Sequence, residues 1–170
     1  MSDQPLPYYP DCFVCGTTPT GLSLRFCRAE DGGIVARNIV FPSIFQGFPG
    51  ILHGGVVSAA LDECALWAAA IKHGDYVVTQ ELTVKFKRPT RTDAAYTASA
   101  RLIAHEGTKL TAVGELVDAD GKLYASVQGV FRPMSAKMAD GFEALVTYPE
   151  HGSNAWRQPR HVPPPAVPAG

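Results

Sequence analysis

The chain has 170 residues, of which 46% are hydrophobic and 18% charged, and its formal net charge is -1. This composition is typical of a folded globular domain and excludes a disordered chain. A net charge close to zero gives no general attraction to nucleic acid or to anionic lipid. We expect no nucleic-acid and no membrane partner and, since neither a secretory leader nor an apolar run of membrane-spanning length occurs, a cytoplasmic protein.

The two ends of the chain differ in composition from its middle. Residues 1–11 are rich in proline and tyrosine and predict an extended N-terminal lead-in, and the segment 148–170 predicts a proline-rich tail that ends in HVPPPAVPAG. The length of the remainder is that of one domain, which we place at residues 12–147.

The first elements predicted in chain order are two strands, at 22–29 and 33–41, joined by a turn at Asp31-Gly32-Gly33. The segment PSIFQGFPGILHGG follows, and its two prolines and four glycines predict a loop. Residues 54–73 contain no proline and many alanines, and Gly74 comes directly after them. We therefore predict one long helix from Gly54 to His73, apolar around most of its circumference and so largely enclosed.

Four further strands are predicted at 76–88, 95–106, 108–118 and 122–132, separated by turns such as Ala119-Asp120-Gly121. Apolar and polar residues alternate in the first of these, so one face of the sheet requires a cover. Strands, one enclosed helix and more strands predict an α+β fold, with an antiparallel sheet of five to six strands wrapped around one long central helix.

The segment FQGFPGILHGGVVSAALDE resembles the signature of the hotdog-fold thioesterase superfamily, and of the PaaI-type acyl-CoA thioesterases in particular. Its core is His53-Gly54-Gly55, with Asp62 seven residues after the second glycine. GLSLRF, LTVKFKRP and GKLYASVQGVF are similar to strands of the same family, so the resemblance covers roughly residues 12–133.

The resemblance implies roles for individual residues. Asp62 is expected to activate water or to attack the thioester carbonyl, and the Gly54 N–H, beside Gly55, to bind the carbonyl oxygen. Gln46 corresponds to an amide near the thioester, and Thr79 to a hydroxyl that a neighbouring subunit contributes. Glu63 is the alternative carboxylate, and His53 is expected to bond loop backbone rather than to act as a base.

Elementary chemistry agrees with these roles. The N-terminus of a helix offers unpaired N–H groups and a favourable dipole to a carbonyl that gains negative charge under attack. A carboxylate in an apolar helix is costly to bury, and burial raises its pKa toward the working range of a general base. Asp62 fits that description, although a lone helical aspartate is more often a surface or capping residue.

Other polar groups allow a functional and a structural interpretation. Four cations, with Lys109 as a further candidate, are expected to bind CoA phosphates or else to form a solvated strand end: Lys85, Lys87, Arg88 and Arg91. Cys12 and Cys15 have the spacing of metal ligands, but no second pair follows, so structural packing or a partial site is favoured over zinc. We expect no metal and no cofactor other than CoA in the substrate.

The sequence thus predicts an acyl-CoA thioesterase. The alternatives are a non-catalytic hotdog protein that binds acyl-CoA or a small aromatic ligand, a hotdog hydratase or dehydratase, and a structural subunit. Exposed sheet edges predict a homo-oligomer, a dimer or a dimer of dimers. Acyl specificity is open; four aromatic side chains are candidates for lining the pocket: Phe45, Phe48, Trp67 and Phe86.

Overall fold

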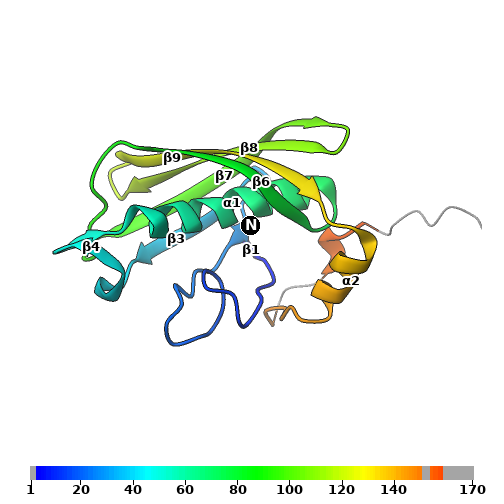
Figure 1. Ribbon diagram of the computed structural model, residues 1–170, viewed down its shortest axis with the longest axis horizontal. Helices are drawn as coiled ribbons and strands as arrows, with labels where there is room; N and C mark the ends of the chain where they lie inside the picture. Colours follow the sequence, from blue (N-terminus) through cyan, green and yellow to red (C-terminus); the bar gives the residue numbers. More distant parts are fainter. Residues whose placement is uncertain (1–2, 151–153, 159–170) are drawn as a thin grey trace, which may run out of the picture.

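A computed structural model describes residues 3–150 and 154–158 of the chain. Its main feature is a seven-stranded antiparallel sheet, in the order β1-β2-β3-β7-β8-β9-β6, that curves around the helix α1 (Figure 1). The strands are β1 Gln4–Pro5, β2 Cys27–Arg28, β3 Ile34–Val40, β4 Gln46–Phe48, β5 Ile51–Leu52, β6 Val77–Phe86, β7 Ala95–Glu106, β8 Lys109–Asp118 and β9 Leu123–Pro133; the α-helices are α1 Gly54–His73 and α2 Ala136–Glu143, and two short 3-10 helices cover Ser43–Phe45 and Asn154–Trp156.

Helix α1 begins and ends where the sequence predicts. His53 caps its N-terminus, and Gly74 ends it in the left-handed conformation with φ 80°, which glycine adopts without steric cost. By length and composition, α1 is also the one helix among the described residues that is apolar enough to cross a membrane. Buried core helices have the same composition, and α1 packs along the inner face of the sheet.

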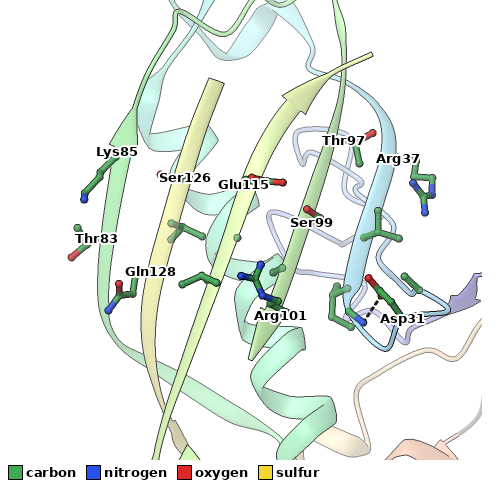
Figure 2. Close-up of a pocket in the computed structure, with 18 residues that line it drawn as sticks. Asp31, Arg37, Thr83, Lys85, Thr97, Ser99, Arg101, Glu115, Ser126 and Gln128 are labelled. Carbon is green, nitrogen blue, oxygen red and sulfur yellow. Dashed lines mark hydrogen bonds between the residues drawn. The ribbon is translucent and has the colours of Figure 1, made fainter. Parts of the chain in front are cut away.

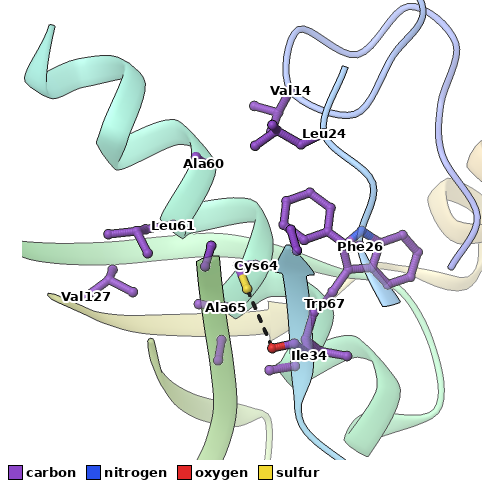
Figure 3. Close-up of a cluster of buried hydrophobic side chains, with 14 of the residues drawn as sticks. Val14, Leu24, Phe26, Ile34, Ala60, Leu61, Cys64, Ala65, Trp67 and Val127 are labelled. Carbon is purple, nitrogen blue, oxygen red and sulfur yellow. Dashed lines mark hydrogen bonds between the residues drawn. The ribbon is translucent and has the colours of Figure 1, made fainter. Parts of the chain in front are cut away.

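Small side chains on the sheet allow α1 to lie close to it. Ala98, Ala112 and Ala125, on three neighbouring strands, are completely buried. On the far side of α1 from these strands, the N-terminal segment supplies Val14, Leu24 and Phe26, which complete the core around Cys64 and Trp67 (Figure 3). The helix is therefore enclosed by the sheet on one side and by an irregular segment on the other.

The hotdog fold expected from the sequence is confirmed, with differences in detail. The sheet has seven strands rather than five or six because the short strand β1 pairs with β2 and extends one edge. Only Cys27–Arg28 of the predicted strand at 22–29 joins the sheet. The reason is that Ser23 has a positive φ of 52°, and the N–H groups of Leu22 and Leu24 bond the carbonyls of Phe13 and Val14 instead.

Both flanking segments contact the domain, and its predicted limits at 12 and 147 remain predictions. Leu6 is buried, and Tyr8 pairs with Thr147. Near the other end, the indole of Trp156 packs edge-on against Trp67, and Arg157 forms an ion pair with Asp75 at 2.9 Å. Residues 151–153 and 159–170 of the predicted tail lie outside the described residues.

Strand β6 forms one edge of the sheet. It pairs with β9 on one side, and within the described residues no strand lies along its other side. Val78 and Phe86 expose 37% and 54% of their surface there. An unpaired edge with exposed apolar side chains is a surface that a second chain can cover.

Candidate active site

The loop before α1 forms a small hairpin. Strands β4 and β5 pair with each other, and Gly50 makes the turn between them with φ 72°. The Gln46 side-chain oxygen accepts a hydrogen bond from the Gly50 N–H at 3.1 Å. The Gln46 side chain, which is expected to lie near the substrate, therefore stabilises this turn. Among the hydrogen bonds of the described residues, none involves its NH₂ group, so this group is available to a ligand.

The start of α1 leaves one N–H group unsatisfied. The Nδ1 atom of His53 accepts from the Gly55 N–H at 3.0 Å, and the His53 carbonyl accepts from the N–H groups of Val56 and Val57. Among the hydrogen bonds of the described residues, none involves the Gly54 N–H. Of the two glycines expected at the site, Gly54 is thus the available donor, while His53 has a capping role.

Asp62 lies two turns further along α1, facing the edge strand. Its Oδ1 atom accepts a hydrogen bond from the Thr79 hydroxyl of β6 at 2.9 Å. Burial raises the pKa of Asp62, and the Thr79 hydrogen bond partly offsets that rise. The Thr79 hydroxyl thus contacts Asp62 of its own chain, and its expected role at the site of a neighbouring subunit remains a prediction.

Gly54 and Asp62 are too far apart to act on one carbonyl within a single chain. Eight residues separate them along the helix, and at 1.5 Å per residue this corresponds to about 12 Å. A carbonyl held at about 3 Å from an N–H donor cannot also meet a nucleophile delivered by a carboxylate at that distance. The two groups therefore lie at two separate places on one helix.

A groove of about 620 Å³ opens beside Gly54, between the β4–β5 hairpin and the end of β6. Phe48 and Phe86 contribute to its walls, and Lys87 and Arg88 lie at its rim; the Phe86 ring is so close that a Cβ at Gly54 would lie 3.3 Å from it. The other two aromatic candidates, Phe45 and Trp67, do not line this groove. Trp67 is buried in the core, and Phe45 packs edge-on against Phe13.

The four predicted phosphate-binding cations do not all gather at this groove. Lys85 lies instead on the outer face of the sheet, in a wide polar depression of about 660 Å³ that it shares with Thr83, Glu115 and Gln128 (Figure 2). Arg91 is held in a two-point ion pair with Asp93. Lys87 and Arg88 are thus the members of the cluster nearest to Gly54.

The sequence profile of the thioesterase superfamily matches residues 49–125, which run from the β4–β5 turn through α1 and the central strands. Over this stretch the chain is similar to the thioesterase superfamily. The matched residues include both Gly54 and Asp62.

Two curated proteins and one solved structure are similar to the chain. An acyl-coenzyme A thioesterase of Bos taurus is 34% identical over 87 residues, which cover 51% of this chain and 35% of that protein. A protein of Saccharolobus solfataricus named as a candidate esterase is 29% identical over 118 residues, or 69% of this chain and 83% of that protein. The PaaI protein from the phenylacetic acid degradation operon of E. coli superposes with a TM-score of 0.61 at 19% identity, over 67% of this chain and 81% of its own, which shows a common fold.

These relatives support a hydrolase of the thioesterase type. Their names describe an esterase and a thioesterase, and the thioesterase superfamily profile agrees with both. The match to the bovine thioesterase spans about a third of that protein, 35%. The reaction of this chain, its substrate and its catalytic groups are therefore matters for a proposal.

Proposed function

We propose that this chain hydrolyses an acyl-CoA thioester to a free acid and CoA. The observation that carries the proposal is the unsatisfied Gly54 N–H, which lies at the positive end of α1 and borders an apolar groove with two cations at its rim. Such a donor stabilises the oxyanion of acyl transfer. The 34% identical bovine protein named as an acyl-coenzyme A thioesterase supports CoA as the thiol.

In the proposed reaction, Asp62 takes a proton from water while the water oxygen attacks the thioester carbon. The carbonyl oxygen becomes an oxyanion and accepts a hydrogen bond from the Gly54 N–H. When the tetrahedral intermediate collapses, the C–S bond breaks, and the CoA thiolate leaves and takes up a proton. If Asp62 attacks directly, an acyl-aspartate forms first and water then hydrolyses it. A raised pKa makes Asp62 a stronger base in either route.

The active centre is composed of two chains. Gly54 and Asp62 of one α1 are separated by about 12 Å, and the unpaired strand β6 carries Thr79, the partner of Asp62. A two-fold pairing along this edge places the same surfaces of two chains against each other. Each of its two sites then takes the Gly54 N–H from one chain and Asp62 from the other.

The first experiment measures release of free thiol from aliphatic and aromatic acyl-CoAs by the wild type and Asp62→Asn. Removal of a general base lowers kcat by about 10²- to 10⁴-fold. Asp120→Asn, an identical change in the exposed β8–β9 turn, serves as the control and should retain full activity. Wild-type binding of acyl-CoA without any turnover would instead support the non-catalytic alternative.

A further inference from the structure

A second group of reactive side chains lies one helix position beyond Asp62. Cys12 and Cys15 of the N-terminal segment meet Glu63 of α1, and the two sulfurs and a carboxylate oxygen all lie within 4.8 Å of one another. The proposed hydrolysis uses none of the three. The sequence favours structural packing or a partial site at this cysteine pair over zinc, and the fold adds a third potential ligand from 51 residues away.

The backbone around the cysteines is folded so that it supports a thiolate. The N–H groups of Val14 and Cys15 point at the Cys12 sulfur, at 3.3 and 3.5 Å. Gly16 closes this turn, and a Cβ there would lie 2.2 Å from the Cys12 carbonyl oxygen. Donors aimed at the sulfur stabilise the thiolate, which is the form in which cysteines bind metals.

Glu63 is a carboxylate without a cationic partner. Its Oε2 atom lies 3.3 Å from the Cys12 sulfur, and among residues 3–150 and 154–158 it takes part in no ion pair. A partly buried carboxylate that faces two sulfur ligands is an arrangement that a bound cation stabilises.

We infer that Cys12, Cys15 and Glu63 bind one zinc ion. Two sulfurs and one carboxylate oxygen are ligands that zinc accepts in tetrahedral geometry. With Zn–S bonds of about 2.3 Å and a Zn–O bond of about 2.1 Å, the edges of such a tetrahedron measure roughly 3.6–3.8 Å. The Cys12 sulfur and the Glu63 Oε2 atom lie 3.3 Å apart, and all three ligand atoms lie within 4.8 Å of one another, so small side-chain movements bring them to these edges. Cys12 is partly exposed, so the fourth position is open to water.

Binding displaces the remaining thiol protons to solvent and ties the 12–15 turn to α1. The ion is therefore structural for the segment that covers the helix. Because Glu63 directly follows Asp62, the same ion also fixes this turn of α1 beneath the edge strand. The inference stands independently of the proposed hydrolysis.

The test uses the purified full chain, without any acyl-CoA. Metal analysis after dialysis against a low concentration of zinc should find one zinc per chain in the wild type and none in the Cys12→Ser, Cys15→Ser double variant. Cys27→Ser, which removes a half-buried thiol outside the cluster, should retain one zinc. Glu63→Gln should weaken binding by at least about tenfold, since loss of even an outer partner costs about 10- to 100-fold.

A second measurement needs no variant. Zinc should protect Cys12 and Cys15 of the wild type from alkylation, as mapped by mass spectrometry, while Cys27 stays equally reactive with and without zinc. Wild-type protein that holds no more zinc than the double variant would overturn the inference. A Cys12–Cys15 disulfide that persists under reducing conditions would also overturn it and would identify a redox pair.

Discussion

The first turn of α1 divides its backbone donors between structure and chemistry. The His53 ring and carbonyl satisfy the N–H groups of Gly55, Val56 and Val57. The Gly54 N–H is left over, at the end of the helix where the dipole is positive. A capping histidine followed by two glycines thus yields one exposed donor, with space above it for a substrate.

Removal of this single donor is possible because proline fits the first position of a helix. His53 already has φ -62° and ψ 132°, an extended conformation that a following proline favours. We predict that Gly54→Pro lowers kcat for acyl-CoA hydrolysis by about 10²- to 10³-fold, as does the loss of an oxyanion donor elsewhere.

Gly54→Ala is the matched control, since it adds a Cβ near the Phe86 ring but retains the N–H. It should lose much less activity than Gly54→Pro, with circular dichroism confirming that both variants fold. Equal activity of the two variants would remove Gly54 from the mechanism.

Thr79 tunes the carboxylate that it contacts. Its hydrogen bond opposes the rise that burial causes in the pKa of Asp62. In Thr79→Val this opposition is lost, so the pKa of Asp62 rises further. Since the base must be ionised, the acidic limb of the kcat/KM profile should move to higher pH, and Thr79→Ser should restore it. A loss of activity without any displacement of the limb would indicate a structural role only.

Two lysines near the end of strand β6 lie in different places. Lys85 points to the outer face of the sheet, and Lys87, just beyond the strand, lies at the rim of the groove beside Gly54. Strand alternation alone would place Lys85 and Lys87 on the same face; they differ because the chain leaves the sheet after Phe86.

The pair Lys87→Glu and Lys85→Glu tests this division with the same change of charge at two positions only two residues apart. We predict that Lys87→Glu raises KM for acyl-CoA roughly fivefold to tenfold, because it replaces an attraction for phosphate by a repulsion. Lys85→Glu should leave KM unchanged. A substrate that lacks the CoA nucleotide should show no difference between the two variants.

The elements that the sequence predicts well are those with local signals. The capping histidine and Gly74 mark the ends of α1, and turn glycines separate the long strands. Helix α2 was not predicted, although its N-cap is visible: the Ser135 hydroxyl accepts from the Met138 N–H. Contacts between distant segments carry no local signal, so neither the same-chain pairing of Thr79 with Asp62 nor the approach of Glu63 to Cys12 could be predicted from the sequence.

The proposed active centre, with Gly54 from one chain and Asp62 from the other, predicts that two inactive variants regain activity when their chains are mixed. In a dimer of one Asp62→Asn chain and one Gly54→Pro chain, one site combines both defects, and the other combines the intact Gly54 and the intact Asp62. Random mixing makes half of the dimers of this kind, so unfolding and refolding of equal amounts should restore about a quarter of the wild-type rate. Mixtures that remain inactive would exclude a site shared between chains.

The unpaired edge at β6 has a consequence for the newly synthesised chain. Strand edges with exposed apolar side chains are templates for aggregation, and Val78 and Phe86 expose such a surface in the single chain. Glu81 and Lys85 interrupt this edge with charges of opposite sign, which disfavours indiscriminate association. The proposed pairing would protect the chain from misassociation by burying the same strand that completes the proposed site, so a substitution at this edge is expected to reduce the amount of protein in the cell as well as its rate.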